Sequence, residues 1–180
     1  ALVIADVSGK GIPAALFMMR AKATIQSHLK SGLGIVEAIV KANHRLTANN
    51  DANMFVTAWI GIVDLATGAL EYVNAGHNPP LVRRADGSVA YLTEKSGPPL
   101  AVMDGIEYRR QSLTLAPGDG LLLYTDGVTE ALNPAQELYG EDRLIGTLRG
   151  TPGSSGAETI LQGVIDSVRA FAAGAEQADD

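Results

Sequence analysis

Residues 55–92 read FVTAWIGIVDLATGALEYVNAGHNPPLVRRADGSVAYL, and this stretch indicates the architecture of the chain. Phe55 to Val63 is rich in aromatic and β-branched residues and is apolar at both parities, which is typical of a strand buried on both faces. Turn residues then separate three further predicted strands, Ala69–Asn74, Leu81–Arg84 and Val89–Leu92. Short connections favour antiparallel neighbours, so the central third of the chain is predicted to be an antiparallel meander.

Helical patterns precede the meander. An apolar run over residues 1–5 predicts a buried strand, and a glycine-spaced turn leads from it into a helix predicted from Pro13 to Leu29. A second helix follows the break at residues 31–34. The predicted buried face of the first helix consists of Ile12, Ala15, Leu16, Met19 and Ala23, and that of the second of Ile35, Ala38, Ile39, Ala42 and Leu46.

Strands and then helices follow the meander. Strands are predicted over Ile106–Leu115 and Leu121–Tyr124, and a short helix over Asp142–Leu148. A longer helix opens at Ser155, where Glu158 suggests a capping box. The apolar stripe of this last helix consists of Ile160, Leu161, Val164, Val168 and Phe171. The order of elements predicts an α+β fold, with sheets between outer helices, rather than a parallel βαβ array.

Composition narrows the classes of function. A chain of 180 residues fits one domain with its own core, and the absence of cysteine excludes a disulfide scaffold, a thiolate zinc site and a cysteine nucleophile. The net charge of −6 and the pI near 5.0 argue against nucleic-acid binding. No apolar run reaches the ~18 residues of a membrane span, and no signal-peptide pattern is seen. We therefore expect a soluble segment without membrane contact.

Acidic residues stand where predicted strands end. Asp6 and Asp126 each follow a strand and precede a glycine-containing turn, and the pair Asp179-Asp180 closes the chain. Carboxylates on rigid strand ends suit hard cations, which predicts a shared Mg²⁺ or Mn²⁺ centre. The alternative is that Asp6 caps a helix and Asp126 initiates a turn. A phosphate-binding loop at residues 8–11 is excluded, because Ile4 stands where that motif needs glycine.

The three histidines differ in the roles that their positions in the sequence predict. His28 and His44 lie near the polar ends of predicted helices, where we expect them to be solvated. His77 lies between two predicted strands, where it could support a metal ligand, act as a general acid or simply fix the loop.

Five motifs occur in one order and together carry a resemblance. They are residues 6–15 (DVSGKGIPAA), 54–57 (MFVT), 74–79 (NAGHNP), 117–119 (PGD) and 124–131 (YTDGVTEA). This set resembles the bacterial stage II sporulation protein E-type phosphatases, a branch of the metal-dependent protein phosphatase 2C superfamily. The resemblance extends over the chain from residue 1 to 180.

The resemblance implies a four-layer α-β-β-α sandwich of two antiparallel sheets flanked by helices, with two Mn²⁺ or Mg²⁺ ions at one end of the sheets. It also implies hydrolysis of phosphoserine or phosphothreonine by a metal-activated water, without a phosphoenzyme. Asp6 matches the carboxylate that bridges both metals, and Val7 the position whose backbone carbonyl coordinates. Asp126 matches a second ligand and Asp179 a third, with Asp180 as the weaker alternative. Asp6 and Asp126 are thus the expected catalytic residues.

The family pattern extends past both ends of this sequence. Its first acidic motif lies upstream of the opening strand, and a further strand follows the final acidic pair. We therefore expect residues 1–180 to be a single catalytic domain truncated at both ends, without its N-terminal strands and its last C-terminal strand.

The resemblance also suggests partners. It implies a phosphorylated anti-sigma-factor antagonist as substrate, and a sensor or receiver domain that regulates the phosphatase. A cytoplasmic location is expected, although a sensor region could tether the full-length protein to a membrane. One alternative is a catalytically weak or inactive regulatory module of the same fold. Another is a metal-dependent nuclease, which the acidic charge balance disfavours. The first helix follows directly from the Asp6 turn, which makes it a candidate switch.

Overall fold

The computed structural model describes residues 1–48, 50–152 and 155–175. The chain divides into two compact units. The first comprises Ala1–His77 and Glu94–Thr114, and the second Asn78–Thr93 and Leu115–Asp180. Among the described residues, none of the helices combines the length and the apolar character that a membrane span requires.

The first unit contains a four-stranded antiparallel sheet in the order β1-β2-β3-β6. Its strands are β1 (Leu2–Val7), β2 (Val56–Val63), β3 (Ala69–Ala75) and β6 (Gln111–Thr114). The interior strand β2 is largely buried, as its apolar sequence predicted, and Trp59 stacks on Tyr72 of β3 with ring centroids 5.5 Å apart. By contrast, β1 lies at a sheet edge with Leu2 and Val3 exposed, so the prediction of a fully buried opening strand was wrong.

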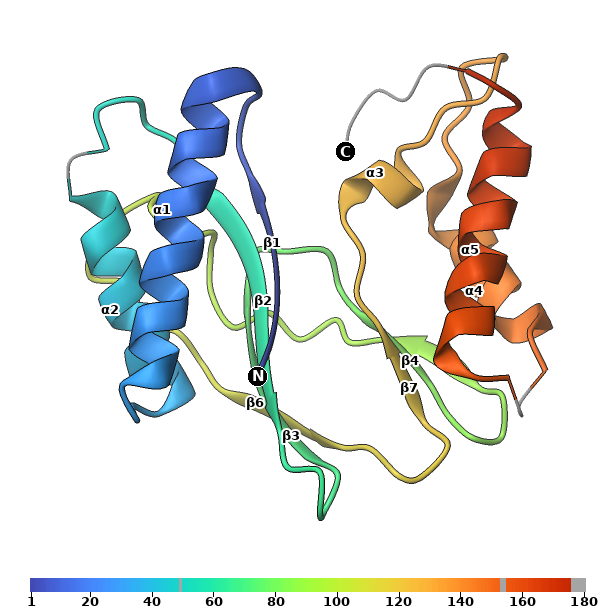
Figure 1. Ribbon diagram of the computed structural model, residues 1–180, viewed down its shortest axis with the longest axis horizontal. Helices are drawn as coiled ribbons and strands as arrows, with labels where there is room; N and C mark the ends of the chain where they lie inside the picture. The colour runs from blue at the N-terminus through green and yellow to red at the C-terminus, as the bar shows by residue number, and fades with distance from the viewer. Residues whose placement is uncertain (49, 153–154, 176–180) are drawn as a thin grey trace. The chain divides into compact units, whose positions relative to one another are not determined.

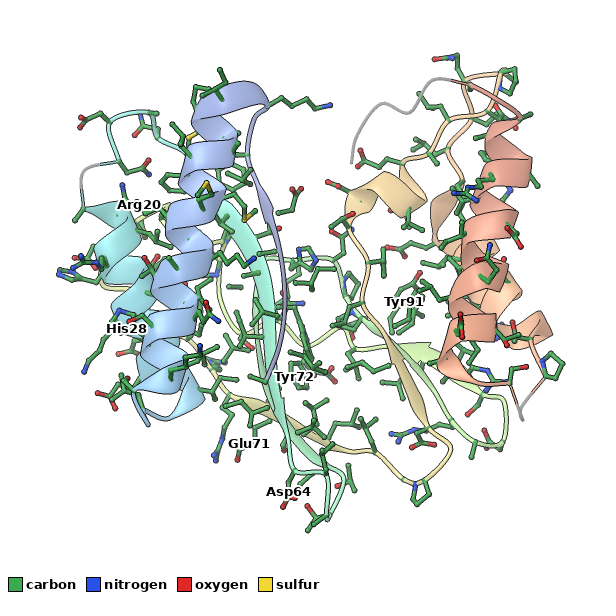
Figure 2. The ribbon with its side chains drawn as sticks, in the orientation of Figure 1. Arg20, His28, Asp64, Glu71, Tyr72 and Tyr91 are labelled. Carbon is green, nitrogen blue, oxygen red and sulfur yellow. The ribbon has the colours of Figure 1, made fainter. Side chains whose placement is uncertain are left out.

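Helices α1 (Gly11–Lys30) and α2 (Ile35–Thr47) lie side by side against this sheet (Figure 1). Every residue of the predicted apolar face of α2 is buried, in a core shared with α1 and the strands. Arg20 of α1, labelled in Figure 2, donates Nη2 hydrogen bonds to the carbonyls of Leu46 (2.6 Å) and Ala48 (2.7 Å). These bonds join α1 to the C-terminal end of α2, where helix carbonyls lack intrahelical partners.

The predicted face of α1 was wrong. Ile12, Leu16 and Met19 are 78%, 62% and 68% exposed, and the buried residues are Ala14, Phe17, Ala21, Thr24 and Ile25. Apolar residues occur on both sides of this helix, so a 3.6-residue period is satisfied by two stripes. The stripe that contains the aromatic ring of Phe17 packs against the core.

The second unit contains a three-stranded antiparallel sheet in the order β5-β4-β7. Its strands are β4 (Leu81–Arg83), β5 (Val89–Tyr91) and β7 (Gly120–Leu122), and its helices are α3 (Asp126–Thr129), α4 (Gly140–Gly150) and α5 (Ala157–Ala172). Helices α4 and α5 pack beside each other and share a core with the sheet (Figure 1). Buried Arg83 donates Nη2 to the carbonyl of Thr151 (2.7 Å), directly after α4.

Three local predictions for the later part of the chain need correction. Strand β6 covers Gln111–Thr114 instead of Ile106–Leu115. Helix α5 begins after Gly156, and no side chain caps it, so the capping box at Ser155 is not formed. Leu161 is 52% exposed, whereas Val164 is buried and Ile160, Val168 and Phe171 pack against the core. The predicted stripe of this helix is therefore right except at Leu161.

Candidate metal centre

Asp6 lies near the end of β1, held by pairing with β2. Its Cα partner is Thr57, and that of Val7 is Val56. The half-buried Asp6 carboxylate accepts a hydrogen bond at Oδ1 from the Val7 backbone N–H (2.9 Å). The N-cap of α1 is Lys10, without a side-chain cap bond, so Asp6 does not cap that helix. The helix-capping alternative for Asp6 was therefore wrong.

The turn after Asp6 depends on glycine. Gly9 and Gly11 have φ angles of +85° and +80°, in the left-handed region that other residues rarely adopt. Ser8 fastens this turn to the residue before β2. Its N–H donates to the Phe55 carbonyl and its Oγ accepts from the Phe55 N–H, both at 2.9 Å. The end of β1 is thus held by bonds beyond its own ladder.

Thr57 and His77 lie beside Asp6. The Thr57 hydroxyl donates a long hydrogen bond to the Asp6 carbonyl (3.4 Å) and contacts His77 Nδ1 at 2.8 Å. His77 is buried, and both of its backbone polar groups bond the side chain of Asn74. The sequence did not predict that Thr57 contacts Asp6 or that Asn74 holds His77, although both residues belong to motifs that the sequence displays.

Asp126 lies in the second unit and opens the short helix α3. Its carbonyl accepts the Glu130 N–H at 2.7 Å, and Thr125 is the N-cap. Asp126 therefore opens a single helical turn, which agrees with the alternative of a turn at this residue. Strand β7 ends at Leu122, two residues earlier than predicted. Tyr124, between the strand and Asp126, is buried, and that burial raises the pKa of its phenol.

The remaining candidates lie elsewhere. Asp179 and Asp180 are outside the described residues. His44 is exposed, as predicted, and its Nδ1 lies 2.8 Å from Asp104 Oδ2, a hydrogen bond that lowers the pKa of the Asp104 carboxyl. His28 is half-buried rather than fully solvated. In residues 1–48, 50–152 and 155–175, no three His, Asp or Glu side chains gather into a group that could hold a metal.

The donor chemistry of the proposed ligands fits a hard divalent cation. Asp6 and Asp126 offer carboxylate oxygens and Val7 a backbone carbonyl, and the chain has no thiol that would favour a softer metal. Oxygen donors of these two kinds are what Mg²⁺ and Mn²⁺ prefer. The hydrogen bond from Val7 N–H to Asp6 Oδ1 also orients the carboxylate before any metal binds.

Comparison with solved structures identifies the fold. The PP2C domain of SiaA from Pseudomonas aeruginosa superposes with a TM-score of 0.82 at 21% identity, over 99% of this chain and 71% of that one. The catalytic domain of the serine/threonine phosphatase PstP, solved in complex with two manganese ions, gives a TM-score of 0.64 at 15% identity, over 92% of this chain and 81% of that one. The α+β class with two antiparallel sheets and flanking helices is thereby confirmed.

Sequence comparison identifies the family. The phosphoserine phosphatase RsbP of Bacillus subtilis is 32% identical over 142 residues, which cover 77% of this chain and 34% of that protein. The chain spans about a third of the length of the curated relatives that it matches first. A model of the stage II sporulation protein E family matches residues 1–180. Because that match covers every residue, the chain belongs to the stage II sporulation protein E (SpoIIE) family, whose fold is that of the PP2C phosphatases.

Proposed function

We propose that this protein is a metal-dependent serine/threonine phosphatase that hydrolyses phosphoserine or phosphothreonine in a protein substrate, with two Mn²⁺ or Mg²⁺ ions. The observation that carries the proposal is the similarity to a relative named phosphoserine phosphatase, 32% identical over 77% of the chain. The pair of manganese ions in the PstP structure supports the choice and number of metals.

Four residues would hold the metals. Asp6 would contribute its carboxylate, and Val7 would contribute its backbone carbonyl. Asp126 and Asp179 would supply further carboxylates, with Asp180 as the alternative to Asp179. A divalent cation, when bound, makes a water nucleophilic at neutral pH and offsets negative charge on the phosphoryl group. The role of the chain is to hold these oxygens in place, and β1–β2 pairing and the Ser8 bonds do so for Asp6 and Val7.

The proposal includes the organisation of the protein. We infer that the two units act together as one catalytic domain over residues 1–180. The family resemblance favours a phosphorylated anti-sigma-factor antagonist as substrate, in the cytoplasm. It also favours a sensor or receiver domain elsewhere in the full-length protein, and the relatives, of which the match covers about a third, have room for one.

The test is Mn²⁺-stimulated release of phosphate from a phosphoserine protein by the full-length protein. Asp6→Asn and Asp126→Asn are each expected to lower turnover by roughly 100-fold or more, the order lost when one group that stabilises transition-state charge is removed. Asn retains an oxygen for the Val7 N–H, so the fold is expected to persist in Asp6→Asn.

A matched control is Glu107→Gln, which neutralises an exposed carboxylate in the same unit as Asp6 and is expected to retain full turnover. Undiminished Mn²⁺-stimulated turnover by Asp6→Asn would refute the proposed function.

A further inference from the structure

Two motifs of the sequence, residues 54–57 and 74–79, supply none of the proposed metal ligands. In the first unit, the motif at 54–57 nevertheless contacts the segment that carries Asp6 and Val7, and His77 of the other motif contacts Thr57. They are far from that segment in sequence, since Thr57 is 51 residues from Asp6 and His77 is 20 residues from Thr57. Their contacts point to a shared task.

One peptide group connects the Thr57 hydroxyl to the Asp6 carboxylate. The peptide that joins Asp6 to Val7 presents the Asp6 carbonyl on one side and the Val7 N–H on the other. The Thr57 hydroxyl donates to that carbonyl (3.4 Å), and the N–H donates to Asp6 Oδ1 (2.9 Å). Rotation of this peptide would therefore move the Asp6 carboxylate through the second bond.

His77 completes the hydrogen-bond chain. A carbonyl oxygen can only accept, so the single Thr57 proton is used toward Asp6. His77 Nδ1 lies 2.8 Å from the Thr57 oxygen, which accepts a hydrogen bond from the ring in the tautomer that carries its proton on Nδ1. The sequence of groups runs from the His77 ring through the Thr57 hydroxyl and the Asp6–Val7 peptide to the Asp6 carboxylate.

The backbone of His77 is itself held by a buried set of bonds. The Asn74 side chain accepts the His77 N–H (2.8 Å) and donates to the His77 carbonyl (3.1 Å), and the Asn74 N–H donates to Ser96 Oγ (2.9 Å). Asn74, Ser96 and His77 are only 2%, 4% and 5% exposed. Buried hydrogen-bonded networks of this kind are rigid, because breaking one bond leaves a polar group without a partner in a dry interior.

We propose that Thr57 and His77 are positioning residues that fix the Asp6–Val7 peptide, and with it the Asp6 carboxylate, in the geometry that a divalent cation requires. The inference rests on the proposed function in one respect, because that function identifies Asp6 as a metal ligand. Partners that orient a ligand commonly raise metal affinity by about 10–100-fold.

The test is titration calorimetry of Mn²⁺ with the full-length protein. Thr57→Val keeps the β-branched shape and removes the hydroxyl, so Mn²⁺ affinity is expected to fall about 10-fold or more. The matched control Thr57→Ser restores the hydroxyl and is expected to bind within about 3-fold of the wild type, by the same reasoning. His77→Asn removes the ring while Thr57 stays, and is expected to weaken binding in the same way.

Two further readouts separate positioning from a general loss of stability. Thermal unfolding is measured in EDTA and in saturating Mn²⁺. A merely structural role lowers both melting temperatures equally, whereas a positioning role reduces the increase that Mn²⁺ causes. In the double variant Thr57→Val/His77→Asn, the loss of affinity is expected to equal that of Thr57→Val alone, because both residues act through one chain of bonds.

The outcomes are distinguishable. Unchanged Mn²⁺ affinity in both Thr57→Val and His77→Asn overturns the positioning role, whatever the turnover. Additive losses in the double variant overturn the single chain of bonds. A wild-type protein that binds Mn²⁺ and shows the expected losses, but releases no phosphate from any phosphoserine protein, overturns the proposed function and leaves the positioning role supported.

Discussion

Gly76→Ala is expected to destabilise the first unit well beyond the usual effect of a methyl group. Gly76 directly precedes His77 and has a φ of +71°. A Cβ atom built at this residue would lie 2.6 Å from Cδ and Cγ of Pro99 and 2.9 Å from its backbone nitrogen. The ring and the main chain of proline cannot move aside easily, so this contact cannot be relieved by a change of rotamer.

A matched control isolates that contact. Gly105 lies in the same unit and has the same φ of +71°, yet a Cβ there would meet nothing within 4 Å. Gly105→Ala therefore carries only the cost of a left-handed backbone, about 1–2 kcal/mol. Gly76→Ala carries that cost and about 1–3 kcal/mol from overpacking, which gives a total of about 2–5 kcal/mol.

The assay is urea unfolding followed by the fluorescence of Trp59. It is the single tryptophan of the chain and is fully buried in the first unit, so its signal reports that unit. Gly76→Ala should shift the midpoint to lower urea by clearly more than Gly105→Ala, without a change in slope. Equal losses of unfolding free energy in the two variants, within about 0.5 kcal/mol, would refute the reasoning from the Pro99 contact.

Three further predictions are also tested by unfolding measurements. Asn43→Ala should lower the unfolding free energy by about 1–3 kcal/mol, because Asn43 Oδ1 accepts the buried Ala101 N–H (2.8 Å) and that donor would lose its partner; a neutral result would show that the N–H finds another acceptor. Leu16→Ser on the exposed side of α1 should change stability by less than about 0.5 kcal/mol, whereas Ile25→Ala on the buried side should cost about 2–5 kcal/mol, and the reverse order would contradict the observed face. In the second unit, the hydrogen bond from Arg84 lowers the pKa of the Asp119 carboxyl. A depressed pKa stabilises the fold above the unfolded value of about 3.9, and this contribution is lost as pH falls through the lower pKa of the folded state. Circular dichroism should therefore show Asp119→Asn less stable than wild type near pH 6, with the difference shrinking as pH falls below about 3.9.

The sequence pattern alone predicted the buried residues correctly in elements whose apolar residues allow only one packing arrangement. Helix α2 has a single apolar stripe, and its predicted residues Ile35, Ala38, Ile39, Ala42 and Leu46 are all buried. Strand β2 has apolar residues at both parities and lies inside its sheet. In both cases each face carries only one kind of residue, so burial follows without knowledge of the neighbours.

The sequence pattern alone gave wrong predictions where it allowed two local arrangements. Helix α1 offers apolar residues on both sides, and only packing against α2 and the sheet selects Phe17 and Ile25 over Leu16 and Met19. The capping box at Ser155 has suitable residues, yet the helix begins after Gly156. Tertiary contacts contribute more free energy than one cap or one periodic stripe, and so they decide such cases.

The amino-acid sequence by itself determined the family, the α+β class and the oxygen-donor chemistry of Asp6, Val7 and Asp126, because these depend on residue types and on spacing within short motifs. The tertiary structure alone decided that Thr57 meets the Asp6–Val7 peptide and that His77 meets Thr57. Their contacts join residues 51 and 20 positions apart, and such neighbours are created by the register of β1 on β2 and by the loop after β3. A motif specifies its own backbone conformation, but the partner of its hydrogen bonds is chosen only when the strands pair.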